Sequence, residues 1–266
     1  LHEAGLISRR ASWAAAGMLA PYAEIGFEEV EFFRMCRESL ELYPRFLDEL
    51  REDLTKYRAL RQQSVDDVNV PKLDACGSLL VALTKDDQAY LERFKAFQDR
   101  LGLRAEMLSS GDAREREPLL SPRIKAALWL PDDKQIDNRA LLRALLAAFV
   151  ERGGVLAPER SVKIIGDTFG RSLTVAAGAY ANEAEPLIAE TNPVRPVKGQ
   201  IVMLQAQEGF SLTHMIRSPR GYIMQKEDGR IVVGATAEDR GFDTSVSAGG
   251  IYDLLKNAYE LVPMTY

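Results

Sequence analysis

ASWAAAGMLAP, residues 11–21, is a run of small and apolar side chains preceded by Glu3, Arg9 and Arg10. The run is too short to span a membrane and too poorly patterned for an amphipathic helix. Side chains this small let main-chain N–H groups approach the polar edge of a large flat ligand, which bulkier residues would hold off. A plain buried helix start is the alternative. Charged, hydroxyl and very small residues seldom cluster so tightly for packing alone, and the stretch therefore indicates a ligand site.

The residues around this run suit a dinucleotide. Glu3 stands where the second strand of a dinucleotide-binding fold would end. A carboxylate there accepts two hydrogen bonds from a ribose diol, although a surface glutamate explains the residue equally well. Arg9 and Arg10 would face a pyrophosphate, and Ser12 would donate its hydroxyl to it.

Composition sets the broad class. The 266 residues carry a net charge of −5, with 46% hydrophobic and 27% charged residues, which suits one large domain or two interleaved ones. Mild acidity argues against nucleic acid as a partner, and no apolar run approaches the ~20 residues of a membrane span. The first residues do not resemble a signal peptide. Cys36 and Cys76 indicate free thiols rather than a disulfide scaffold, so we expect a cytoplasmic protein.

Periodicity predicts helices and strands that alternate at first and an antiparallel sheet later. The expected helices are 27–54, interrupted or kinked at Pro44, then 85–101 capped by Thr84, 138–152 capped by Asp137, and one from Ser245 or Ser247 to Leu261. The expected strands are 77–83, 125–133, one near Val155, 162–165, 174–180, and three between 197 and 235 with a hairpin at Asp228-Gly229.

This order predicts an α/β, Rossmann-like cofactor domain interleaved with an α+β substrate domain built on a mixed or antiparallel sheet with helices. The cofactor domain is assigned to 1–70, 134–192 and 245–266, and the substrate domain to 71–133 and 193–244. Only His2 and His214 are present, and neither Cys nor His spacing suits zinc, so no metal site is expected. No G-x-S-x-G elbow accompanies His214, which is interpreted as structural or as a surface residue.

Several segments in the same order resemble the D-amino-acid oxidase and sarcosine oxidase family of FAD-dependent amine oxidases, and among these the glycine oxidases. The matching segments are Glu3-Ala4-Gly5 with RRASWAAAGMLAP (9–21), IDNRALLRALL (136–146), VRPVKGQ (194–200), GYI (221–223) with DGRIVVGAT (228–236), and the helix from SAGG (247–250) to LVP (261–263). Each motif alone is weak, but the ordered combination is specific and covers most of the chain.

The resemblance implies a role for each site residue. Glu3 would bind the adenosine ribose with Ala4 beside it. Ala11 and Ser12 would contact the pyrophosphate, and Ala16, Gly17 and Met18 would line the isoalloxazine. Val162 would hold the adenine through its backbone, although a valine in a strand core is an equal alternative. Tyr222 would hydrogen-bond the substrate carboxylate, against the alternative that it packs in the core or faces outward.

The resemblance also implies an activity. FAD would take a hydride from the Cα of glycine, sarcosine or a small D-amino acid, the imine would hydrolyse, and O2 would be reduced to H2O2. No side-chain base is needed, so no catalytic residue is assigned. A role in thiamine precursor synthesis and a homo-oligomer are expected with this activity. A dehydrogenase passing electrons to a quinone and a non-catalytic remnant of the fold remain alternatives.

Two family motifs do not occur in the sequence. The G-x-G-x-x-G turn would precede Glu3, and the arginine that pairs with the substrate carboxylate would follow Pro263. The segment 166–175 is also short, as if a surface hairpin were absent. We therefore expect that the given sequence contains only part of the cofactor domain and that the whole protein is a longer enzyme.

Overall fold

The computed structural model describes residues 2–3, 10–61, 69–158, 174–184, 190 and 194–263. The helices are α1 (Ala11–Ala14), α2 (Pro21–Glu24), α3 (Val30–Arg61), α4 (Lys85–Arg100), α5 (Ser110–Arg116), α6 (Asn138–Glu151), the 3-10 turn η2 (Gly178–Tyr180), α7 (Ala181–Ala184) and α9 (Ala248–Leu261). The strands are β1 (His2–Glu3), β2 (Met18–Leu19), β3 (Leu73–Asp74), β4 (Ser78–Ala82), β5 (Glu106–Ser109), β6 (Ala126–Leu130), β7 (Lys134–Ile136), β8 (Ala157–Pro158), β9 (Ile201–Gln205), β10 (Met215–Ser218), β11 (Gly221–Gln225) and β12 (Arg230–Gly234).

A mixed sheet of seven strands, in the order β5-β6-β4-β10-β11-β12-β9, organises the molecule. Only the β10–β4 pair is parallel, and the other pairs are antiparallel. The strands come from both segments assigned to the substrate domain, 71–133 and 193–244. The division of the chain into cofactor and substrate domains stays a prediction.

The two faces of this sheet carry separate cores, because successive side chains of a strand point to opposite faces. On one face, Ile216, Ile223 and Val233 pack with Leu254 and Leu261 of α9. The opposite face is covered at its β4–β6 end by α4 and the start of α3, and at its β10–β12 end by residues 16–20. The stretch that opened the sequence analysis therefore lies directly on the sheet.

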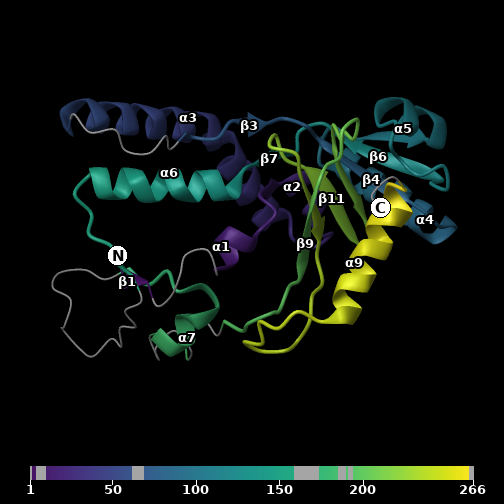
Figure 1. Ribbon diagram of the computed structural model, residues 1–266. Coiled ribbons are helices and arrows are strands. Elements are labelled where there is room, and N and C mark those ends of the chain that lie inside the picture. Colours follow the sequence, from purple (N-terminus) through teal and green to yellow (C-terminus); the bar gives the residue numbers. More distant parts are fainter. Residues whose placement is uncertain are drawn as a thin grey trace.

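Beyond its start, α3 leaves the large sheet and lies side by side with α6, and these two helices form a second layer (Figure 1). Leu50 and Leu54 of α3 pack against Ala144 and Ala148 of α6. The other side of α3 is highly charged and exposed. Among the described residues, no helix combines the length and apolar character needed to cross a bilayer.

Several local predictions are confirmed. Thr84 caps α4 in a reciprocal capping box with Asp87, and the Asp137 carboxylate accepts bonds from the amides of Arg139 and Ala140 at the start of α6. Ser247, rather than Ser245, caps α9. The Asp228-Gly229 turn joins β11 to β12, and Gly229 has a φ of 84°.

Other local predictions are wrong. The expected strand 174–180 is an irregular segment followed by η2, because Gly178 has a φ of 56° that interrupts an extended run. The long helix begins at Val30 instead of Phe27 and runs to Arg61, continuing through Pro44. The strand expected near Val155 is present as β8, two residues further along, and it pairs in parallel with β1. The strand predicted at 162–165 lies outside the described residues.

Candidate functional site

Gly17 makes the turn between α1 and β2. Its φ is 75°, a conformation that side chains other than glycine rarely adopt, and an added Cβ would collide with the carbonyl oxygen of Ile136. The Gly17 carbonyl in turn accepts a hydrogen bond from the Ile136 amide over 2.9 Å. The glycine therefore lets the small-residue stretch lie against β7 with main chain touching main chain.

The short helix α1 is fixed from the side by α6. Asn138 donates from Nδ2 to the carbonyl oxygens of Ser12 (2.7 Å) and Trp13 (3.2 Å). Arg139 donates from Nε to the same Trp13 oxygen, and its guanidinium lies over the indole, 5.2 Å from the ring centroid. The position of α1 is thus set by α6, whose own start is capped by Asp137.

Ala16, Met18 and Tyr222 belong to one cluster on the face of the sheet opposite α9. Ala16 is buried, Met18 and Tyr222 are partly buried, and they pack with Met215 and Met224. The structure thus brings together the residue predicted for substrate and two of those predicted for the isoalloxazine.

The phenol of Tyr222 has a neighbour without a side chain. Tyr222 is paired across β11 and β12 with Gly234, and a Cβ added to Gly234 would collide with the phenol oxygen and the ring. Burial raises the pKa of Tyr222 to about 12, an effect opposed by the charge of Arg217 and reinforced by Glu24. The phenol therefore stays protonated at neutral pH and can donate a hydrogen bond.

Lys226, at the end of the same hairpin strand, is 5% exposed. Its ammonium donates to Gln135 Oε1 (3.0 Å) and to the Ile136 carbonyl oxygen (2.9 Å), and it lies beside the position a Cβ on Gly17 would take, at 3.2 Å. Burial lowers the pKa of this lysine to about 8, against the opposing charge of Asp137. The sequence analysis missed Lys226, because an isolated lysine next to a turn reads as a surface residue.

Arg217 was missed for a similar reason. It is paired across β10 and β11 with Tyr222, so both side chains leave the same face of the sheet. Its Nη1 donates to Glu24 Oε1 over 2.6 Å and lies 3.7 Å from the sulfur of Met18. The available signal was the alternation of side chains along Met215–Ser218, which places Arg217 on the same face as the apolar Met215.

The remaining predicted residues are placed as follows. Ala11 and Ser12 are exposed on α1, and Glu3 lies in β1, paired with Pro158 of β8. Ala4, Arg9 and Val162 lie outside the described residues.

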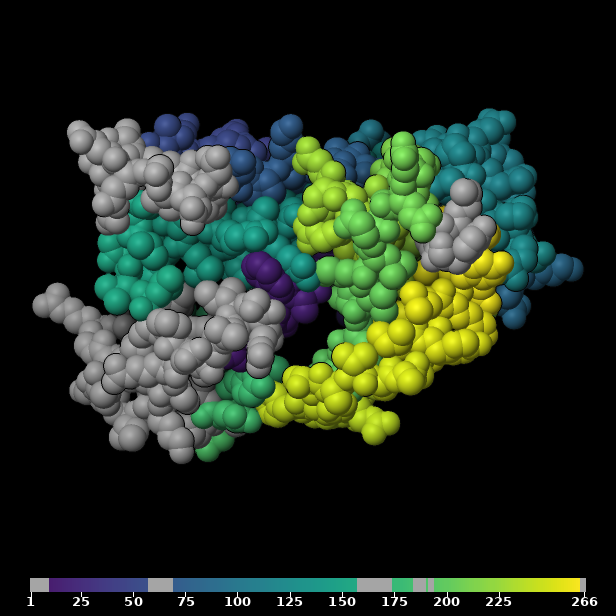
Figure 2. All heavy atoms as spheres, in the orientation of Figure 1, coloured from purple at the N-terminus to yellow at the C-terminus, as the bar shows by residue number. Residues whose placement is uncertain are grey.

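The segment around α1 has the properties needed beside a flat cofactor such as FAD. Figure 2 shows a hollow bordered by α1, by α7 and by the yellow segment after β12. On α1 and at its C-cap, the exposed residues Ala11, Ser12, Ala14 and Ala15 all have small side chains, which leaves room for a ligand to approach the main chain. Arg10 adds a cation suited to a pyrophosphate, lying 5.9 Å from the ring centroid of Tyr180. By size, charge and accessible main chain, these residues fit the group.

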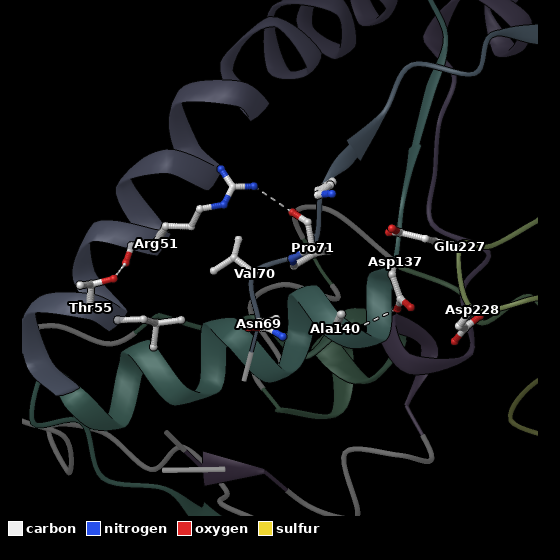
Figure 3. Close-up of a pocket in the computed structure, with 11 residues that line it drawn as sticks. Arg51, Thr55, Asn69, Val70, Pro71, Asp137, Ala140, Glu227 and Asp228 are labelled. Carbon is white, nitrogen blue, oxygen red and sulfur yellow. Dashed lines mark hydrogen bonds between the residues drawn. The ribbon is translucent and has the colours of Figure 1, made fainter. Parts of the chain in front are cut away.

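A separate pocket of about 650 Å³ lies between α3, α6 and the tip of the β11–β12 hairpin (Figure 3). Asp137, Ala140, Glu227 and Asp228 line one side of it, and Arg51 donates to the Pro71 carbonyl on the other. None of the residues predicted for cofactor or substrate lines it, so this pocket is not the candidate site.

His214 and Cys76 form a structural contact. The His214 Nδ1 lies 2.5 Å from the Cys76 carbonyl oxygen, and its ring meets the edge of Trp129 at 4.7 Å. Burial raises the pKa of the Cys76 thiol to about 12, so the thiol is unreactive at neutral pH. No group of three or more possible metal ligands occurs within the described part of the chain.

Comparison with known proteins agrees with this geometry. The family described as FAD dependent oxidoreductase (DAO) matches residues 1–265. The glycine oxidase of Geobacillus kaustophilus is 30% identical over 277 residues, covering 99% of this chain and 70% of that protein. Its crystal structure superposes with a TM-score of 0.82 at 29% identity, over 98% of this chain and 70% of that one. The bifunctional protein ThiO/ThiG of Trichormus variabilis is 30% identical over 95% of this chain and 38% of its own length.

The chain therefore belongs to the FAD-dependent oxidoreductases of the DAO family, which makes it part of a flavoenzyme. Within that family, it is similar to the glycine oxidases in both sequence and fold.

Proposed function

We propose that the protein oxidatively deaminates glycine or a similarly small amine with FAD and O2, and that it does so in the cytoplasm in thiamine precursor synthesis. The observation that carries the proposal is the cluster of Ala16, Met18 and Tyr222 on one face of the sheet. The similarity to glycine oxidases and to ThiO/ThiG supports the substrate and the pathway.

Bound FAD would supply the redox chemistry: the Cα of the amine would lose a hydride, water would hydrolyse the resulting imine, and O2 would accept the electrons and become H2O2. The protein's own residues do the positioning. Tyr222 donates its phenol hydrogen to the substrate carboxylate, which its protonated state at neutral pH permits. Ala16, Gly17 and Met18 offer main chain to the isoalloxazine, and Ala11, Ser12 and Arg10 lie towards the pyrophosphate. Glu3, Ala4 and Val162 are proposed for the ribose and the adenine.

The alternative function differs in the molecule that accepts the electrons. A dehydrogenase of the same fold would reduce a quinone and form no peroxide. The chain spans 70% of the glycine oxidase that it matches, so the test uses the full-length protein.

The experiment has two stages. An absorbance spectrum of the purified full-length protein should show the bands of an oxidised flavin, and a colourless protein that stays colourless when incubated with FAD would refute the proposal. Glycine, sarcosine and small D-amino acids are then compared for peroxide formation and for reduction of an artificial dye. Peroxide with glycine supports the oxidase, and dye reduction without peroxide supports the dehydrogenase.

A further inference from the structure

Arg217 and Tyr222 are the two side chains with strong hydrogen-bonding groups in one row across the sheet. The row contains Leu80, Arg217, Tyr222, Gly234 and Ile201, each paired with the next by strand register. Side chains directly opposite each other on neighbouring strands have Cβ atoms about 5 Å apart. Arg217 and Tyr222 therefore leave the sheet side by side, and the charge of Arg217 acts on the phenol that is proposed to bind the substrate carboxylate.

The guanidinium of Arg217 has donors to spare. It carries five N–H groups, and its recorded contacts are one bond from Nη1 to Glu24 and a long contact to the sulfur of Met18, a weak acceptor. Among the described residues, no further acceptor is bonded to it. The Arg217 side chain is 20% exposed and that of Glu24 is 52% exposed. The cation is thus largely covered, while its carboxylate partner reaches into solvent and can move away.

We propose that Arg217 binds a second anionic group of the substrate, so that the site favours small amines carrying a carboxylate in addition to the one held by Tyr222. This inference rests on the proposed function. A substrate with a single carboxylate on Tyr222 leaves Arg217 with Glu24. A second carboxylate can take two parallel N–H bonds from the guanidinium, a geometry that lysine could not provide. Glu24 then acts as an internal carboxylate that the ligand displaces.

The test compares two secondary amines that differ in one carboxylate. Sarcosine carries a methyl group on nitrogen where iminodiacetate carries a carboxymethyl group. Binding of each to the full-length protein is measured by calorimetry without oxygen, after dithionite has reduced the flavin, so that neither amine can be oxidised during the titration. We expect iminodiacetate to bind at least tenfold more tightly than sarcosine, and Arg217→Gln to remove most of that difference while changing sarcosine affinity less than threefold. Arg220→Gln is the matched control, because Arg220, in the turn between β10 and β11, pairs with Glu260 of α9, and it should change neither affinity.

Glu24→Gln gives a second, opposite prediction. Removing the competing charge should tighten iminodiacetate binding severalfold and leave sarcosine unchanged. Glu24→Gln also tests whether Arg217 binds the second carboxylate if Arg217→Gln does not fold. Equal affinities for the two amines in the wild type, equal losses in Arg217→Gln, or no gain in Glu24→Gln would each overturn the proposal. Because an already reduced flavin cannot oxidise either amine, the calorimetry reports binding alone, and a failure here is distinct from the absence of flavin or of peroxide.

Discussion

The ammonium of Lys226 donates a hydrogen bond to the main-chain oxygen of Ile136 over 2.9 Å, the same oxygen that a side chain on Gly17 would strike. A buried cation and a glycine turn therefore meet at one carbonyl group. Lys226 ties the β11–β12 hairpin to β7, and β7 in turn pairs with β2, so the lysine connects the hairpin that carries Tyr222 to the small-residue stretch.

Lys226 should make stability depend on pH in the alkaline range. Its folded pKa, about 8, lies below the ordinary value of 10.5, so between these values the unfolded chain binds more protons and stability rises with pH. At about 1.4 kcal/mol per unit, the rise is on the order of 3 kcal/mol. Urea unfolding of the wild type and of Lys226→Met from pH 7 to 11 measures the rise as the difference in unfolding free energy between the two proteins, because the raised pKa values of Cys76 and Tyr222 lower the stability of both in the same range. The difference should grow with pH for Lys226→Met and stay constant for the exposed Lys125→Met; parallel curves for Lys226→Met and the wild type would contradict the assignment.

Gly17→Ala should destabilise the protein by clearly more than backbone strain alone. An alanine with positive φ costs about 1–2 kcal/mol, and here the Cβ also strikes Ile136. Gly102→Ala is the matched control, since Gly102 has a φ of 68° with nothing within 4 Å of the added Cβ. Thermal unfolding and flavin absorbance measure the two effects. Equal losses in the two variants would show that main-chain contact at Gly17 is unimportant.

Tyr222→Phe should weaken substrate binding by about 1–2 kcal/mol, the value of one hydrogen bond to a charged group. The loss should appear in KM for glycine and in the dissociation constant of acetate, with little change in flavin content. Tyr252→Phe on α9, where the tyrosine is 64% exposed, controls for the loss of a hydroxyl. An unchanged affinity in Tyr222→Phe would remove this residue from the site.

Asp137→Ala should cost about 1–2 kcal/mol of stability at neutral pH, because the carboxylate caps α6 through two amides and also pairs with Arg230. Burial would raise the pKa of Asp137, but the amide of Ala140 and the charge of Arg230 lower it below the ordinary value. The stabilisation is therefore present at neutral pH and lost as the pH falls below about 4. Unfolding curves of the wild type and Asp137→Ala should converge in acid. Asp137→Asn keeps an oxygen that can accept the cap hydrogen bonds and should retain part of the stability. A difference in stability between the wild type and Asp137→Ala that persists in acid would contradict the role of the ionised carboxylate.

Local signals predicted the parts of the fold that depend on local chemistry. Thr84 and Asp137 were identified as caps because a side-chain oxygen near a helix start bonds amides two or three residues away. The Asp228-Gly229 turn was identified because a left-handed glycine closes a short hairpin. The prediction of a strand at 174–180 was wrong because it relied on the apolar residues of this segment and ignored Gly178, which interrupts the extended backbone.

The partners of the candidate site could not be predicted in the same way. Arg217 meets Glu24 across 193 positions of the chain, and Lys226 meets Ile136 across 90. Such contacts arise from strand order, and the parallel placement of β10 beside β4 has no signal within either strand. Tyr222 was selected because its segment resembles a family motif, whereas Arg217 lies in β10, a strand that the sequence analysis did not predict.

Gly234 offers a way to adjust the candidate site without altering any group that would touch a ligand. The aromatic ring of Tyr222 rests on the bare backbone of this residue. A methyl group there would tilt the ring and shift the hydroxyl sideways. Residue 234 therefore governs how far the phenol reaches, and because burial raises the pKa of Tyr222, a shift that exposed the hydroxyl would also make it more acidic.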